Sequence, residues 1–76
     1  MANLLATKME EALRPIIGTV LASVSVEVES KRIGKTPDTI DRSDLYRISE
    51  NMASSLHLVV GTDVAHAAAQ KIREIN

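Results

Sequence analysis

Two histidines are the residues most suited to acid–base or metal chemistry in this sequence. Histidine is the side chain that ordinarily changes charge near neutral pH, and Asp63 lies between the two, His57 and His66. A turn at Gly61 would bring these three side chains close enough to hold a metal ion or share a proton. However, the histidines do not have the i, i+4 spacing of a helical metal site, and the chain has no cysteine. We therefore interpret both as surface or interface residues, and we expect no catalytic residue, no metal, no cofactor and no enzymatic activity.

Acidic residues occur in pairs, which elsewhere serve as acid–base catalysts or cation ligands. The pairs are Glu10 with Glu11, Glu27 with Glu29, and Asp41 with Asp44. The first two pairs lie where a helix needs charge on its surface, and the third suits the start of a helix. We therefore interpret the first two pairs as solvated surface residues and the third as a helix cap.

Basic residues gather around one loop, where they could hold a phosphate. They are Lys31, Arg32 and Lys35, with Arg42 and Arg47 beyond the loop. Acidic residues nearby and a net charge of −1 weaken the field that would attract nucleic acid. A small regulatory protein that binds DNA or a ligand through the loop Lys31–Lys35 is the alternative function, although nucleic acid is not the partner we expect.

The composition sets the scale of the protein. With 76 residues, the chain forms one domain, 1–76, and its single aromatic residue, Tyr46, leaves an aliphatic core. The longest nearly apolar run, from Pro15 to Val26, has about twelve residues, too few to cross a membrane. No signal peptide is recognisable, and the lack of cysteine fits a cytoplasmic location.

The elements that would position these residues are helices. Apolar residues at spacings of three and four predict one long helix over 3–33, with Asn3 as its cap and Gly34 at its end. They are Leu5, Met9, Leu13, Ile16, Ile17, Val20, Leu21, Val24 and Val28. Pro15 should kink this helix, because proline cannot donate to the helical ladder.

Part of this segment also has the pattern of a β-strand. Polar and apolar residues alternate strictly from Ser23 to Glu29, and a second short β-like run begins at Leu56. A small α+β fold with strands near 22–30 and 55–60 is therefore the alternative. We favour the helix, because the helical apolar face continues through Val28 in phase.

Two shorter helices are predicted after the loop, at 42–60 and 63–75. Asp41 and Asp44 form a capping box at the start of the first, and Ile40 packs on Leu45 as a hydrophobic staple. Gly61 ends that helix and separates it from the next.

The predicted length of the first helix indicates more than one chain. A helix of about 30 residues is about 45 Å long, whereas a globule of this size is about 30 Å across. The fold class is therefore an all-α, three-helix chain that forms an intertwined helical-bundle homodimer. The expected interface residues are Val20, Val24, Val28, Tyr46, Met52 and Leu56. The function we expect is a non-enzymatic interaction module that binds itself or another protein.

Overall fold

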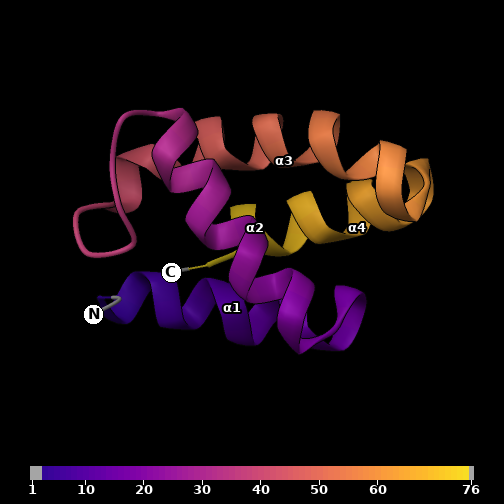
Figure 1. The fold of residues 1–76 in the computed structure, drawn as a ribbon, viewed down its shortest axis with the longest axis horizontal. Helices are drawn as coiled ribbons and strands as arrows, with labels where there is room; N and C mark the ends of the chain where they lie inside the picture. Colours follow the sequence, from indigo (N-terminus) through magenta and orange to yellow (C-terminus); the bar gives the residue numbers. More distant parts are fainter. Residues whose placement is uncertain (1–2, 76) are drawn as a thin grey trace.

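Residues 3–75 fold as four α-helices and one short 3₁₀ helix. A computed structural model describes residues 3–75 (Figure 1). The elements in chain order are α1 (Leu4–Ile17), α2 (Thr19–Arg32), η1 (Arg42–Asp44), α3 (Leu45–Val60) and α4 (Thr62–Arg73). The all-α prediction is confirmed. The alternative with strands near 22–30 and 55–60 is wrong, because residues 3–75 contain no strand and both segments are helical.

The helices form two hairpins joined by the loop 33–41. α3 and α4 run antiparallel, while α2 turns back from the end of α1 and crosses diagonally toward the start of α3 (Figure 1). Both hairpin turns lie at the same end of the molecule (Figure 1). Buried alanines at 65, 68 and 69 let α4 lie close against its neighbours.

The single long helix predicted over 3–33 is wrong, because the segment forms two helices. Pro15 lies inside α1, which continues past it to Ile17. The chain breaks instead at Gly18, where φ is 85° and ψ is 163°. Only glycine adopts this region readily, and the Gly18 N–H still donates to the Arg14 carbonyl at 2.9 Å. The break separates α1 from α2, so the three predicted helices are four.

The core lies between the two hairpins and is aliphatic throughout. Its fully buried large side chains include Met9, Leu13, Ile48, Met52 and Ile72. The molecule measures 29 × 20 × 20 Å, with a radius of gyration of 10.7 Å. One chain therefore encloses its own core, and the argument for a dimer from an overhanging helix is wrong.

The capping box that the sequence predicted lies at the start of η1, which leads directly into α3. The Asp41 side chain accepts a hydrogen bond from the Ser43 N–H, and Asp44 Oδ2 accepts from the Asp41 N–H at 2.9 Å. Lys35 Nζ donates to Asp44 Oδ2 at 2.7 Å. Lys35 also donates its N–H to the Ser30 carbonyl at 2.9 Å, in a Schellman turn with Gly34 at φ 77°. The end of α2 is thus tied to the start of α3.

We expect Asp44→Asn to destabilise the fold by about 1 kcal/mol near pH 7, the usual effect of a lost cap. The hydrogen bond from Lys35, together with the one from the Asp41 N–H, lowers the pKa of Asp44 from 3.8. A lowered folded-state pKa stabilises the fold above the unfolded pKa, and this contribution disappears as the pH falls through the folded value. Urea unfolding at pH about 7 and about 2 should show the two proteins converging in acid. A difference in stability that stays constant with pH would contradict this role.

Candidate functional site

The most unusual surface feature is a row of valines on the outer side of α2. Val20, Val24 and Val28 follow at every fourth residue, and they are 77%, 48% and 42% exposed. The opposite side of α2, which includes Ala22 and Val26, is buried in the core. Soluble surface helices are normally apolar on one side only. We call Val20, Val24 and Val28 the α2 stripe.

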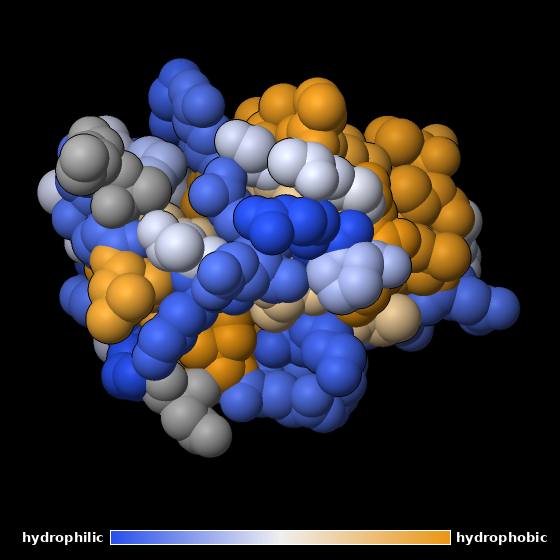
Figure 2. Space-filling model, turned by 90° about the horizontal axis from the view of Figure 1, so that it is seen from below, coloured by the Kyte–Doolittle hydropathy of each residue, from blue (hydrophilic) through white to orange (hydrophobic). Residues whose placement is uncertain are grey.

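The apolar surface is not spread evenly over the molecule. Figure 2 shows apolar residues gathered along one edge and at the end where, in Figure 1, both hairpin turns lie. Besides the α2 stripe, Leu4, Leu58 and Val59 are exposed large aliphatic residues. Contiguous apolar patches on a soluble protein mark contact sites for proteins or ligands.

The charged residues near the α2 stripe balance one another. Glu27 Oε1 lies 3.2 Å from Lys31 Nζ, one helical turn apart along α2. Both side chains are exposed, so this pair adds little to stability. It does leave the outer side of α2 without net charge.

The other predicted interface residues lie elsewhere. Met52 and Leu56 are buried in the chain's own core, so a partner cannot reach them in the folded protein. Tyr46 is exposed, but its ring faces α4, where the Arg73 guanidinium lies 5.4 Å from the ring centre. Hydrogen bonding and charge from Glu50 raise the pKa of Tyr46. The structure therefore groups the three valines and leaves Tyr46 apart from them.

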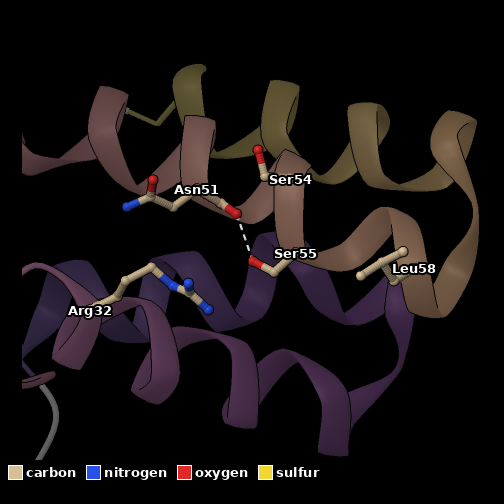
Figure 3. A pocket seen from close by; sticks show the side chains of 5 residues that line it. All are labelled: Arg32, Asn51, Ser54, Ser55 and Leu58. Atoms are coloured by element: carbon tan, nitrogen blue, oxygen red, sulfur yellow. Dashed lines mark hydrogen bonds between the residues drawn. The ribbon is translucent and has the colours of Figure 1, made fainter.

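A small open pocket lies between α2 and α3. It has a volume of about 330 Å³ and is lined by Arg32, Asn51, Ser54, Ser55 and Leu58 (Figure 3). Arg32 comes from α2 and the other four from α3. Polar groups occupy one end and the middle of the pocket, and Leu58 forms the other end (Figure 3).

A buried carboxylate, that of Glu29, contacts two of the residues that line this pocket, Arg32 and Ser55. Glu29 is 2% exposed; its Oε1 lies 3.0 Å from Arg32 Nε, and its Oε2 accepts a hydrogen bond from Ser55 Oγ at 2.9 Å. The sequence reasoning placed Glu29 on a solvated helix surface. A signal was present, because a helix over 22–30 puts residue 29 on the same side as Ala22 and Val26.

The histidines meet in a different groove, between α3 and α4. His57, His66 and Glu50 line it, but Asp63 does not. His57 Nδ1 lies 2.6 Å from the Ser54 carbonyl, so its imidazole is used within its own helix. Within residues 3–75, no group of three or more histidine, aspartate or glutamate residues could hold a metal ion.

The basic residues of the loop are paired with acids. Lys31 contacts Glu27, Arg32 contacts Glu29, and Lys35 contacts Asp41 and Asp44. These contacts reduce the positive field that a phosphate backbone would meet.

None of the helices in the described part of the chain is both long and apolar enough to traverse a bilayer. Comparison of the chain with known protein families, with curated protein sequences and with solved structures gives no match.

Proposed function

We propose that the protein is a non-enzymatic interaction module that associates with a second copy of itself through the α2 stripe. The observation that carries this proposal is the exposure of Val20, Val24 and Val28 on a helix whose other side is already buried. Burying a valine is worth about 1.5 kcal/mol or more, which favours covering this row with a partner.

A second copy suits this surface better than a charged partner. The chain has a net charge of −1, so two copies repel each other little. The Glu27–Lys31 pair leaves the α2 stripe without net charge, so a strongly acidic or basic protein gains nothing there. The same apolar row on both molecules is self-complementary, as a two-fold interface requires.

An antiparallel pairing of the two α2 helices fits the spacing of the valines. With the two-fold axis at Val24, Val20 meets the partner's Val28, and the two Lys31 side chains lie at opposite ends, about 21 Å apart. A specific interface needs about 800 Å² from each molecule, about a fifth of the 4396 Å² surface. The α2 stripe is the centre of such an interface.

Sedimentation equilibrium tests this proposal. We expect a monomer–dimer equilibrium in the wild-type protein and a dissociation constant raised about 100-fold or more in Val24→Lys. The lysine would face the partner's lysine at the two-fold axis, where each charge is desolvated without a counter-ion. Because Val24 is on the surface, the circular dichroism spectrum should not change.

Val59→Lys is the matched control, since it also removes an exposed valine but lies on α3, outside the α2 stripe. It should dimerise like the wild type. A wild-type protein that stays monomeric at about 100 μM would overturn the proposal, because a specific dimer should be populated there. If Val24→Lys dimerised with unchanged affinity, the interface would not include the α2 stripe, and the proposal would be wrong.

A further inference from the structure

Arg32 presents the free end of its guanidinium group to the pocket between α2 and α3. Its Nε lies 3.0 Å from the buried Oε1 of Glu29, and its side chain is 51% exposed. Within residues 3–75, Glu29 is the single carboxylate in contact with Arg32. A guanidinium carries five N–H donors in a fixed fork, so the Nη end stays open for a second acceptor.

Glu29 holds Arg32 in this position. Ser55 Oγ lies 2.9 Å from Glu29 Oε2 and 2.6 Å from the Asn51 carbonyl, the bond drawn in Figure 3. One hydroxyl has one proton, so it serves these acceptors in turn. Glu29 Oε1 has no hydrogen bond of good geometry, although Arg32 Nε is near. The buried charge of Glu29 is therefore compensated mainly by Arg32, which cannot swing away without leaving that charge unpaired.

This arrangement favours one class of anion. The Glu29–Arg32 pair is neutral as a whole, and Glu29 repels a multiply charged group such as a phosphate dianion. A carboxylate carries one charge, and its two oxygens match the Nη fork. Fixing the guanidinium beforehand lowers the entropy lost when such a ligand binds.

The end of the pocket opposite Arg32 fits an apolar tail. The side chains of Asn51 and Ser54 border its middle, and Leu58, which is 82% exposed, forms the far end (Figure 3). Asn51 and Leu58 are about 10 Å apart along the axis of α3. We propose that this pocket binds a small monocarboxylate with an apolar tail, with the carboxylate on the Nη end of Arg32 and the tail along α3 toward Leu58.

An NMR titration of the full chain with hexanoate tests this site. We expect saturable shifts of the Asn51, Ser54 and Leu58 amide signals, with a dissociation constant on the order of millimolar for a ligand of this size. Hexanol lacks the carboxylate and inorganic phosphate lacks the tail, so neither should give the same saturable shifts at equal concentration.

Arg32→Gln should weaken hexanoate binding about tenfold or more, while Arg47→Gln, on the same chain but outside the pocket, should not. Arg32→Gln also strips Glu29 of its counter-charge and is therefore expected to lower stability. A second variant, Leu58→Glu, changes an exposed residue, keeps the fold, and should weaken hexanoate binding to a similar degree. Linear shifts without saturation, equal shifts with hexanol, or unchanged affinity in Leu58→Glu would each overturn the proposal. The proposed carboxylate site does not depend on dimerisation, so Val24→Lys should bind hexanoate as the wild type does.

Discussion

Met52→Ala is expected to lower the free energy of unfolding by about 2–5 kcal/mol, the usual range for a large side chain removed from a core. Met52 is fully buried in the middle of α3, and it belongs to the same cluster as Met9, Leu13 and Ile48. The substitution leaves a cavity in the core. The surrounding helices can close it only partly, because glycine turns and caps fix their ends. Urea unfolding monitored by circular dichroism measures the loss.

The dependence on protein concentration shows whether Met52 serves the core or an interface. A substitution in the core destabilises each chain by the same amount at every protein concentration. A substitution at an interface changes the stability through the dimer equilibrium, so its effect depends on concentration. Val28→Ala is the matched control from the α2 stripe. It should change the stability of the isolated chain by no more than about 0.5 kcal/mol and should weaken association instead. An effect of Met52→Ala that disappears on dilution would contradict its place in the core.

The parts of the fold that the sequence predicts correctly depend on local chemistry. The all-α class follows from apolar residues spaced by three and four. The start of η1, which leads into α3, follows from Asp41 and Asp44, whose reciprocal hydrogen bonds are present as expected. The Asn3 cap is also confirmed, since its side chain accepts from the Ala6 N–H at 2.8 Å. Each of these signals lies within a few residues along the chain, where side chain and backbone meet whatever the tertiary fold.

The break at Gly18 is not visible in the hydrophobic pattern. The apolar positions continue from α1 into α2 in phase, so the pattern is the same for one helix as for two. Gly61 was predicted to end a helix, as it does in the structure, and Thr62 follows it. Gly18 is also followed by a threonine, Thr19, and both glycines adopt φ near 85° and ψ near 163°. The shared Gly-Thr pair is the signal that would have placed both turns.

Which of the apolar rows stay exposed could be predicted only in part, for a physical reason. An apolar row on a helix shows that something covers it, but not whether the cover is the same chain or another. On α3 the row with Met52 and Leu56 is covered by the chain itself. On α2 the chain covers the opposite side, which includes Ala22 and Val26, and leaves the three valines in solvent. The pocket could not be predicted, because it requires α2 and α3 to lie side by side.

Gly18→Ala and Gly61→Ala should each destabilise the protein by about 1–3 kcal/mol. A Cβ atom at either position would meet nothing within 4 Å, so a steric clash contributes nothing. The whole effect comes from the backbone, because a positive φ near 85° with extended ψ is strained for any L-residue. Thermal unfolding of each variant measures the loss.

A D-alanine at the same positions separates backbone strain from loss of the glycine itself. The conformation is the mirror image of an ordinary extended one, so a D-residue fits it without strain. A chemically synthesised chain with D-alanine at position 18 should be as stable as the wild type, or more stable by about 0.4–1 kcal/mol, since its unfolded state has less freedom than one with glycine. If the L- and D-alanine chains lost equal stability, Gly18 would not hold the left-handed turn. Because this turn folds α2 back on α1, strain there should also loosen the helix that carries the α2 stripe. Gly18→Ala is therefore expected to weaken self-association more than Gly61→Ala, although both destabilise the fold by the same mechanism.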